Sequence, residues 1–504
     1  MVGIVGIYRT RIAASPYSSL RRMSDAMEHR GKQRLTLSGT DLHERFALDI
    51  RSPVTQDFYA KHKGRQTLVV CGWNVRQDII DRLLGTQVPL TDNDGASRTQ
   101  GLSDALILRT NESGLLLSRF GHSTSPIYYQ SWEEGLAFST ERKALWRIGL
   151  SKPIELEPGQ TLHVDAHQPQ PTIRTQERTY PGVNKSRSKE ELLASLRSRL
   201  RDCFNCLHSA ENVGVLFSGG VDSSLAALLA KYVCRNVTLF TACGKGSHDE
   251  EFVCEAAQAL EMELKVVPFD KDRVWGVLPE LIYAIETTRQ MDVEIALPLF
   301  VAACAARASG DRILISGQGP DELFAGYARH ARLFAEMGED ALDEELRSEI
   351  QETHRVNIGR DERAIGYNGL SAFFPYLNSQ FVSEALEVPS RWKISPSGIP
   401  ERKVIFRELA IKMGLPETLA SGPKKATQYS SGSQKILSKA VSEKVKIQRD
   451  IVSLKPDRIV QLVLDKIGIE LGMPIPSMPN AELSIDLDTA HEFAQKIGET
   501  SRRQ

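Results

Sequence analysis

The chain has 504 residues and a mass of 56.1 kDa, which is more than one hydrophobic core ordinarily supports, so we expect about two to four domains. Its 63 Lys and Arg residues against 64 Asp and Glu residues give a formal net charge of −1. This balance argues against a nucleic-acid-binding protein, and no apolar run approaches the roughly 18 residues of a membrane span. We therefore expect partners that are small molecules, with no nucleic acid and no membrane.

The sequence starts Met-Val-Gly-Ile-Val-Gly at 1–6. It shows no basic segment, long apolar segment or cleavage-site pattern there, so we expect no secretory signal. Seven cysteines, an odd number, are scattered along the chain and predict reduced thiols rather than a disulfide framework. Both observations favour a cytoplasmic protein.

Short apolar runs separated by turns occupy the first 180 residues and predict a mainly antiparallel sheet domain with a few helices. The clearest runs are 67–70, 114–117, 126–129 and 161–164. From Thr172 to Lys189 the apolar residues thin out, which predicts a solvated connection. We place a first domain at 1–180 and a linker at 181–189.

Strands and helices alternate after the linker. Ser188 followed by Glu191 predicts a capping box at the start of an amphipathic helix. Strands are then expected at 213–217, 237–242, 264–269 and 312–316, with helices near 224–233, near 249–260 and up to residue 308. This order predicts an α/β domain with a doubly wound parallel sheet, whose ligands bind at the carboxyl ends of the strands. We assign it residues 190–440, and residues 441–504 are expected to form a helical C-terminal extension.

A glycine-rich turn follows the first of these strands, with the sequence Leu-Phe-Ser-Gly-Gly-Val-Asp-Ser-Ser at 216–224. Such a turn presents backbone N–H groups, hydroxyls and the positive end of a helix to an oxyanion. The lysine of a Walker A loop is missing. The pattern is instead similar to the pyrophosphate loop of ATP pyrophosphatases, enzymes that split ATP between its α and β phosphates.

A second turn follows the strand at 312–316 and reads Ser-Gly-Gln-Gly-Pro-Asp-Glu-Leu-Phe-Ala-Gly-Tyr at 316–327. Its small residues let the backbone approach a ligand. Asp321 and Glu322 offer the hard oxygen ligands that magnesium prefers, although both acids could simply cap the next helix. Two acid-bearing turns at carboxyl ends of parallel strands favour the ligand site.

These two turns resemble the asparagine synthetase family, as do Phe-Pro-Tyr-Leu-Asn at 374–378 and a lysine-bearing stretch at 423–432. In the first half, the segments that look like the glutaminase domain of those enzymes are 3–6, 29–31, 118–121, 126–129, 138–141, 143–145 and 157–159. The resemblance implies an α+β N-terminal antiparallel sandwich, similar to Ntn hydrolases and to type 2 glutamine amidotransferases. An ATP-pyrophosphatase domain, similar to adenine nucleotide α-hydrolases, would follow it.

The resemblance also implies a reaction and its cofactors, ATP and Mg2+. A carboxylate, with the side chain of L-aspartate as the best guess, would be adenylated with release of pyrophosphate, and ammonia would then convert it to asparagine. If the protein forms an oligomer, we expect a homodimer.

The family pattern assigns roles to individual residues. Pyrophosphate would be held by Ser218, Gly219, Gly220, Ser223 and Ser224, and Mg2+ by Asp222 with Asp321. The nucleotide would be lined by Leu216, Ala242, Ser316 and Gly317. Lys425 would stabilise the leaving group, and Lys424 competes for that role because this loop is one residue longer than the common pattern.

The first half departs from an active glutaminase in three places. Family glutaminases use an N-terminal cysteine as the nucleophile, whereas position 2 is Val2. The segment matching Asn-Gly-Glu reads Cys-Gly-Trp at 71–73, and the one matching His-Arg-Gly-Pro-Asp reads His-Arg-Gly-Lys-Gln at 29–33. We therefore expect a glutaminase-like domain that does not hydrolyse glutamine.

The second half departs from asparagine synthetases at Gln318, Asn378 and Glu294, which leaves the acyl substrate open. The alternatives are a β-lactam-synthetase-like cyclase or another amide ligase, a tRNA-modifying ATP pyrophosphatase, and a catalytically silent binding protein. Gln-Tyr-Ser-Ser at 428–431 differs from the His-Glu-Gly run of the cyclases. The near-zero net charge disfavours tRNA as the substrate.

Overall fold

The structure of the protein is a computed structural model. It describes residues 2–9, 17–38, 46–53, 58–63, 66–73, 80–81, 83, 104–111, 114–133, 135–165, 171–175, 182–244, 248–395, 401–422, 432–447, 456–475, 483–485 and 487–500.

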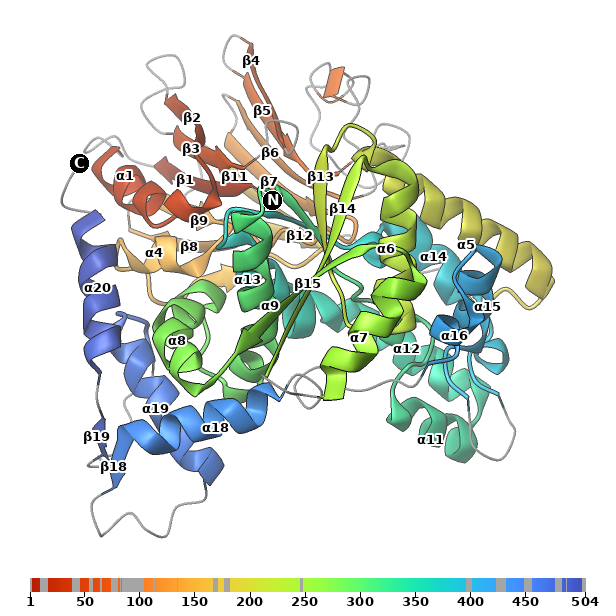
Figure 1. The fold of residues 1–504 in the computed structure, drawn as a ribbon. Helices are drawn as coiled ribbons and strands as arrows, with labels where there is room; N and C mark the ends of the chain where they lie inside the picture. The colour runs from red at the N-terminus through yellow and green to blue at the C-terminus, as the bar shows by residue number, and fades with distance from the viewer. Residues whose placement is uncertain are drawn as a thin grey trace.

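Two six-stranded sheets form the N-terminal part of the molecule (Figure 1). Their strands are β1 (Gly3–Arg9), β2 (Gln33–Ser38), β3 (Phe46–Ser52), β4 (Phe58–Lys63), β5 (Gln66–Cys71), β6 (Ala105–Asn111), β7 (Gly114–Phe120), β8 (Tyr128–Trp132), β9 (Gly135–Ser139), β10 (Ile154–Glu155), β11 (Gln160–Asp165) and β12 (Thr172–Thr175). The first sheet has the order β10-β8-β9-β1-β3-β2 and the second the order β12-β11-β7-β6-β5-β4. All of these pairs are antiparallel.

The two sheets pack face to face because alternate residues of their central strands point to one shared core. On β1, Ile4 and Tyr8 join that core together with Val69 of β5 and Leu117 of β7. The intervening β1 residues, such as Val5, pack on the opposite face of the sheet against α1 (Tyr17–Asp25) and α4 (Arg142–Trp146). The antiparallel sandwich expected from the sequence is therefore present. The finer likeness to Ntn hydrolases stays a prediction.

The second part is built on a five-stranded parallel sheet with the order β15-β14-β13-β16-β17. Its strands are β13 (Asn212–Leu216), β14 (Asn236–Gly244), β15 (Glu263–Phe269), β16 (Ile313–Ile315) and β17 (Ser371–Phe373). Chain order reverses between β13 and β16, so the crevice at their carboxyl ends is the expected ligand position of a doubly wound sheet. The parallel sheet predicted from the sequence is confirmed.

Helices cover the parallel sheet and share one large core with it (Figure 1). They include α5 (Lys189–Phe204), α6 (Val221–Val233), α7 (His248–Ala259), α8 (Lys271–Ile285), α9 (Gln290–Ala308), α10 (Pro320–Leu323), α11 (Ala328–Met337), α12 (Glu339–Thr353), α13 (Gly359–Gly366), α14 (Ser379–Glu387), α15 (Val404–Lys412) and α16 (Glu417–Ala420). The predicted capping box is formed at the start of α5, because Ser188 accepts from the Glu191 backbone and Glu191 reaches back to the Ser188 backbone.

The chain after residue 432 forms α18 (Ser433–Lys444), β18 (Val445–Ile447), α19 (Pro456–Glu470), β19 (Leu483–Ile485) and α20 (Asp488–Thr500). Apolar residues of α19, such as Val463 and Ile467, are buried in the core of the parallel-sheet domain. In Figure 1 these helices lie beside α8, and α20 reaches towards the N-terminal sheets, where Arg147 donates to the Ile497 carbonyl at 3.0 Å. The domain limits proposed from the sequence stay a prediction.

One expectation is wrong in detail. Residues 172–175, predicted as the start of a solvated connection, form the edge strand β12, which pairs with β11. The four residues are exposed, and an exposed edge strand has little need of an apolar pattern.

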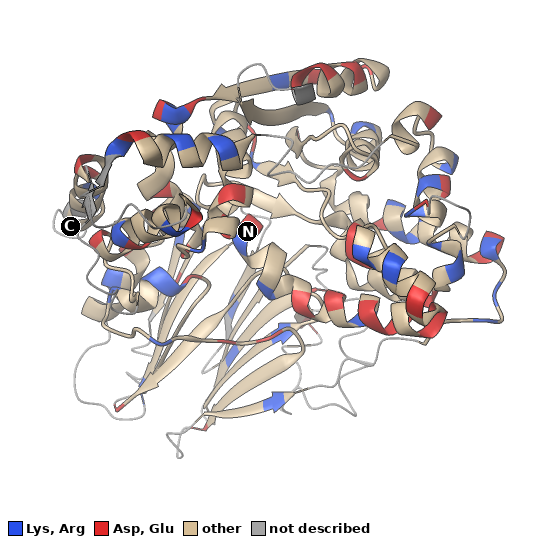
Figure 2. Ribbon diagram, turned by 90° about the horizontal axis from the view of Figure 1, so that it is seen from below, with Lys and Arg blue, Asp and Glu red and all other residues tan. Residues whose placement is uncertain are grey.

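Surface charge is mixed. Figure 2 shows basic and acidic residues on helices throughout that view, some of which are mainly acidic. Among the helices within the described ranges, none combines the length and apolarity that a bilayer crossing requires. All seven cysteines fall within those ranges, and each is a free thiol.

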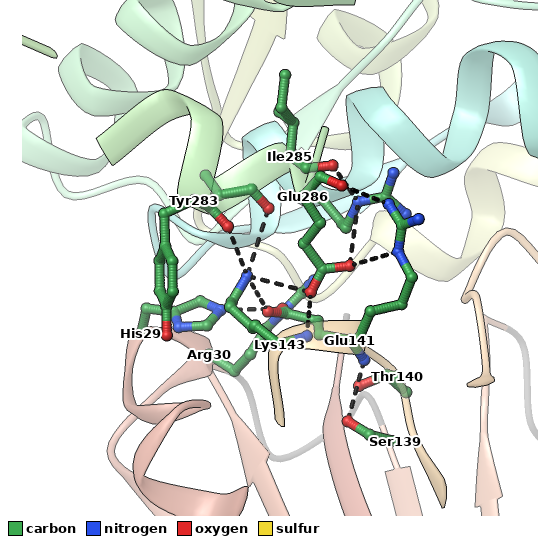
Figure 3. A network of polar contacts seen from close by, with 12 residues as sticks. His29, Arg30, Ser139, Thr140, Glu141, Lys143, Tyr283, Ile285 and Glu286 are labelled. Atoms are coloured by element: carbon green, nitrogen blue, oxygen red, sulfur yellow. Dashed lines mark hydrogen bonds and ion pairs between the residues drawn. The ribbon is translucent and has the colours of Figure 1, made fainter. Parts of the chain in front are cut away.

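A buried cluster of charges joins the two halves of the chain (Figure 3). Arg30 forms ion pairs with Glu141, also in the N-terminal domain, and with Glu362 of α13; its Nη2 donates to Glu362 Oε2 at 3.0 Å. His29 Nε2 lies 2.9 Å from Glu141 Oε1, and Lys143 pairs with the other oxygen of that carboxylate. The side chains of Arg30, Glu141, Lys143 and Glu362 are each about 1% exposed, so the cluster is an internal joint rather than a surface contact.

The same joint continues to the turn after α8. Glu286, in the left-handed conformation at φ 59°, accepts the Lys143 backbone N–H at 2.8 Å. Arg142 donates to the Glu286 carboxylate at 3.2 Å, and Arg363 of α13 donates to the Tyr128 hydroxyl at 2.9 Å. The contact is tight, because a Cβ at Gly366 would lie 1.9 Å from Arg30 Nη1.

We expect Arg30→Ala to lower the free energy of unfolding by about 3–5 kcal/mol, since it leaves the buried Glu362 carboxylate without its cation and removes one of the two cations that pair with Glu141. Urea unfolding followed by tryptophan fluorescence measures the change. The matched control is Arg355→Ala, whose pair with Glu352 is mostly exposed and should be worth at most about 1 kcal/mol. Equal effects of the two substitutions would contradict a central role for the joint.

The same joint predicts a pH dependence of stability. Burial lowers the pKa of His29 to about 4, against the opposing pull of Glu141. As pH falls from about 6.5 to 4, the unfolded chain takes up a proton that the folded protein refuses, so stability should drop by up to about 3 kcal/mol.

The substitution that tests this is His29→Asn, which should flatten the stability profile between pH 6.5 and 4, whereas His208→Asn, at an exposed position, should leave the profile as it is. Urea unfolding at half-unit pH steps provides the comparison. An unchanged slope in His29→Asn would refute the assignment.

Candidate functional site

The two turns predicted from the sequence meet at the carboxyl ends of β13 and β16. They border a cavity of about 240 Å3. It is lined by residues of the first turn (Leu216, Phe217, Ser218, Gly220, Val221, Asp222, Ser223), of the second turn (Ser316, Gly317, Gln318, Asp321, Gly326), of β14 (Phe240, Thr241, Ala242, Cys243), of α7 and α9 (Phe252, Val253, Pro298, Leu299, Ala302), and by Arg402, Lys403, Arg407 and Gly422.

The first turn leads directly into α6. Gly219 is in the left-handed conformation at φ 73°, and a Cβ there would lie 2.8 Å from the Phe252 ring, so glycine is required. Gly220 is the N-cap of α6 and provides no side chain for its first N–H groups. The positive end of α6 therefore remains available to an anion.

Hydroxyl groups organise this turn. Ser223 Oγ accepts from the Ser218 backbone N–H at 3.2 Å and lies 3.1 Å from Ser218 Oγ. Thr241 of β14 donates to the Phe217 carbonyl, and the Tyr376 hydroxyl donates to the Asp222 carbonyl at 2.8 Å. The turn is therefore braced from two sides before any ligand binds.

The second turn packs directly on the first. A Cβ at Gly317 would lie 3.0 Å from the Ser223 nitrogen, which leaves little room for a larger side chain. Gly319 has a φ of 117° and precedes Pro320, the first residue of α10. This geometry turns the chain so that Asp321 faces the cavity.

A lysine connects the two acids of the site. Lys403 Nζ lies 2.6 and 2.8 Å from the carboxylate oxygens of Asp222 and 2.7 Å from Asp321 Oδ1. Its side chain is 3% exposed. Gly326 makes room for the pair, because a Cβ at that position would lie 2.3 Å from Lys403 Cε.

Lys403 is positively charged in this setting. Burial alone would lower its pKa, but attraction to Asp222 and Asp321 outweighs that effect and raises the pKa above its ordinary value. Lys403 itself adopts a left-handed φ of 59° as the N-cap of α15, a conformation unusual for a residue with a long side chain. This backbone conformation places the Lys403 ammonium between the turn after β13 and the turn after β16.

Two arginines add positive charge without a carboxylate partner among the described residues. Arg402 Nη1 donates to the Gly326 carbonyl at 2.7 Å. Arg407 donates to the carbonyls of Arg402 at 3.0 Å, of Gly422 at 3.2 Å, and of Ala420. Both line the cavity, so it combines backbone N–H groups, hydroxyls and three cations at one end. This arrangement suits a polyanion such as a triphosphate.

Most of the predicted site residues lie together. Those that line the cavity are Leu216, Ser218, Gly220, Asp222, Ser223, Ala242, Ser316, Gly317 and Asp321. Gly219 and Ser224 were expected to hold pyrophosphate but do not line it; Ser224 is fully buried and its Oγ has no hydrogen-bond partner among the described residues. Lys424 and Lys425 fall outside the described residues.

The residues that the sequence pattern missed are Arg402, Lys403 and Arg407. A basic stretch opening an amphipathic helix was the local signal, but such stretches are commonly solvated. The partner Asp222 is 181 positions away from Lys403, so no sequence spacing could reveal the pair.

Gln318, where many family members carry Glu, is held by a buried acid. Its Nε2 donates to Asp361 Oδ2 of α13 at 2.9 Å. Glu322 turns away from the cavity and accepts from the Tyr327 hydroxyl at 2.6 Å. Burial and repulsion by Asp321 raise the pKa of Glu322 to about 7. Of the two adjacent acids, only Asp321 can therefore reach a ligand.

The other two departures noted in the sequence lie outside the cavity lining. Asn378 caps α14 by accepting from the Gln380 backbone N–H at 3.0 Å. Glu294 accepts from Gln290 within α9 at 2.8 Å, and burial raises its pKa. Both residues serve the local structure in this state of the protein.

The donor set fits magnesium in its chemistry. Asp222 and Asp321 converge on one point, as their distances to Lys403 Nζ show, and carboxylate oxygens are ligands that Mg2+ accepts. At that point the Lys403 ammonium already supplies a positive charge. No cluster of three or more His, Cys, Asp or Glu side chains suited to a metal occurs in the part of the chain that the structure describes.

A small cavity of about 30 Å3 in the N-terminal domain is lined by Val2 and by residues 71–73, the positions that depart from the glutaminase pattern. Its volume is close to that of one water molecule. Val2 is 4% exposed and packs in the core between the sheets. Asp104, also in the lining, accepts from the Ser379 backbone N–H of α14 at 3.0 Å, so this carboxylate is committed to the neighbouring domain.

Comparison with known proteins agrees with this geometry. The family model Asparagine synthase matches residues 195–339 and 335–461, together more than half of the chain. The chain belongs to the asparagine synthase family.

Individual relatives show the same likeness. The chain is 29% identical over 372 residues to a protein of Methanocaldococcus jannaschii named as a glutamine-hydrolysing asparagine synthetase, covering 65% of this chain and 68% of that protein. It is 28% identical to glutamine-hydrolysing asparagine synthetase B of Escherichia coli, covering 47% and 44%. It is 38% identical over 126 residues to asparagine synthetase domain-containing protein 1 of Mus musculus, covering 24% and 20%.

The site predicts that Lys403→Gln weakens the binding of pyrophosphate about 10- to 100-fold, since a charged hydrogen bond is lost and two facing carboxylates remain unneutralised. Isothermal titration calorimetry measures the affinity. The control is Lys412→Gln at the other end of α15. Its side chain is 50% exposed, and its ammonium forms a loose surface pair with Glu408 at 3.7 Å. Undiminished affinity in Lys403→Gln would remove Lys403 from the anion site.

Proposed function

We propose that the protein is an ATP-dependent, AMP-forming carbon–nitrogen ligase that adenylates a carboxylate and then aminates it. Our best candidate for the acid is the side chain of L-aspartate, with ammonia as the amine and asparagine as the product. The observation that carries this proposal is the convergence of two acid-bearing turns and Lys403 on one cavity at the switch point of the parallel sheet.

In the first step the substrate carboxylate attacks the α-phosphorus of ATP, and the bond to pyrophosphate breaks. Negative charge grows on the leaving pyrophosphate. The N-terminus of α6, the Ser218 and Ser223 hydroxyls, and Lys403 are fixed in place before the reaction and would stabilise that charge. Lys425, or Lys424, is proposed to add a further cation from the loop at 423–432.

Asp222 and Asp321 would hold Mg2+, which when bound neutralises phosphate charge and orients the triphosphate. The nucleotide would be lined by residues at or just after the carboxyl ends of the strands, namely Leu216, Ala242, Ser316 and Gly317. In the second step the amine attacks the acyl carbon and AMP leaves. Gln318 cannot accept a proton from the amine because its side chain is an amide.

We propose that ammonia comes from solution rather than from glutamine. Val2 provides no nucleophile, and the cavity it lines is near the volume of a single water. The cyclase reading, in which the substrate's own amine attacks, is the second candidate; a silent N-terminal domain is compatible with both. Cytoplasmic location and a homodimer remain predictions.

The test is pyrophosphate release from ATP with L-aspartate. We expect release that depends on aspartate, AMP as the second product, and asparagine when ammonia is added, with no asparagine from glutamine. Asp222→Asn should reduce turnover by about 100-fold or more, since it removes one of the two carboxylates proposed to hold Mg2+ and the carboxylate that pairs with Lys403. Activity with glutamine alone would refute the claim about Val2, and ATP binding without aspartate-dependent release would shift the proposal to another acid.

A further inference from the structure

A second cavity, of about 540 Å3, lies between the N-terminal domain and the C-terminal helices. Its lining residues are Arg142, Trp146, Ser151, Lys152, Pro153, Glu286, Thr287, Thr288, Arg458, Gln461, Leu462, Asp465, Met473, Pro474 and Ile475. It shares no lining residue with the cavity at the strand ends. Its size is within the range of small-molecule sites, roughly 300–1,000 Å3.

Separate parts of the chain build this cavity. Its walls are α4, the segment 151–153, the turn after α8, α19 and the segment 473–475. Figure 1 shows α4, α8 and α19 on the same side of the molecule, and Figure 3 shows Glu286 within the joint that ties the domains together. A ligand here would touch both domains and the C-terminal region at once.

The acidic residues of the lining are already satisfied by the protein. Glu286 has a fully buried side chain that is bound by Arg142. Asp465 Oδ1 accepts from the Thr288 hydroxyl at 2.6 Å and from Gln461 Nε2 at 2.9 Å. Neither carboxylate therefore needs a cation from a ligand.

The basic residues, in contrast, have unused donors. Arg142 uses Nε and Nη2 for Glu286 and is about 30% exposed. Within the described ranges, no ion pair is formed by the Lys152 ammonium or the Arg458 guanidinium, and both residues are exposed at the cavity. The excess charge that faces the cavity is positive.

An aromatic ring and apolar side chains complete the lining. Trp146 is part of the wall, and its indole Nε1 is buried away from solvent. The Arg142 guanidinium lies 5.7 Å from the Trp146 ring centre. Leu462 and Met473 contribute apolar surface.

We propose that this cavity binds an organic phosphate. The phosphate would be held by Arg142, Lys152 and Arg458, and the apolar part of the ligand would lie against Trp146 and Leu462. The charges of Lys152 and Arg458, which form no ion pair among the described residues, and the remaining donors of Arg142 favour a dianion over a single carboxylate. The proposal does not depend on the reaction catalysed at the strand ends.

Phenyl phosphate is the probe, since it combines a dianion with a flat apolar ring. The full chain is labelled with 5-fluorotryptophan, which reports its five tryptophans by fluorine NMR, and Trp146→Phe assigns the resonance of Trp146. We expect phenyl phosphate to shift that resonance saturably, and to do so also with pyrophosphate present to fill the other anion site.

The decisive variant is Arg458→Glu, which should weaken binding by at least about 10-fold, because it reverses one of three charges. Its matched control is Arg332→Glu at an exposed position of α11 outside the lining, which should bind as the unmodified protein does. The proposal is overturned by no shift at millimolar phenyl phosphate, by equal binding in both variants, or by loss of the shift when pyrophosphate is added. Benzoate binding as tightly as phenyl phosphate would overturn the assignment of a phosphate.

Discussion

The site depends on one ion triad, in which the buried Lys403 lies between the partly exposed carboxylates of Asp222 and Asp321. Without a cation, two carboxylates that both lie within 2.7 Å of the same point would repel each other. The Lys403 ammonium at that point attracts both of them and offsets the repulsion. The same contact fixes the start of α15 against the turns after β13 and β16. One interaction therefore ties the two turns to the start of α15 before nucleotide or metal arrives.

The N-terminal domain contributes to the structure through residues that the family pattern associates with a glutaminase. Arg30, Glu141 and Lys143 belong to segments that resemble that domain, yet here they form the buried joint with α13 and the turn after α8. Separating the domains would leave Glu286 and Glu362 of the second domain without the cations that Arg142, Lys143 and Arg30 of the first domain provide. The N-terminal domain therefore contributes buried ion pairs to the structure, whatever its chemistry.

Local patterns predicted what local physics determines. Ser188 and Glu191 lie three residues apart, and their capping box follows from short-range geometry; the strands of the parallel sheet were readable for the same reason. The Lys403 triad and the Arg30 joint could not be read, because their partners are separated by 181 and 332 positions and only the tertiary fold brings them together. Ser224, a motif position expected to hold pyrophosphate, is fully buried and does not line the cavity, so its contact with a ligand stays a prediction.

Gly366 of the second domain and Arg30 of the first domain fit together closely, so a substitution in one domain should affect the other. Arg30 Nη1 occupies the space that a Cβ at position 366 would enter, so a larger residue at 366 would displace the guanidinium from the two carboxylates, Glu141 and Glu362, that share it. Substitutions at positions 30 and 366 should therefore affect each other. Coupled variation between residues 30, 141, 362 and 366 would be the evolutionary trace of this fit, even as the rest of the N-terminal domain drifts.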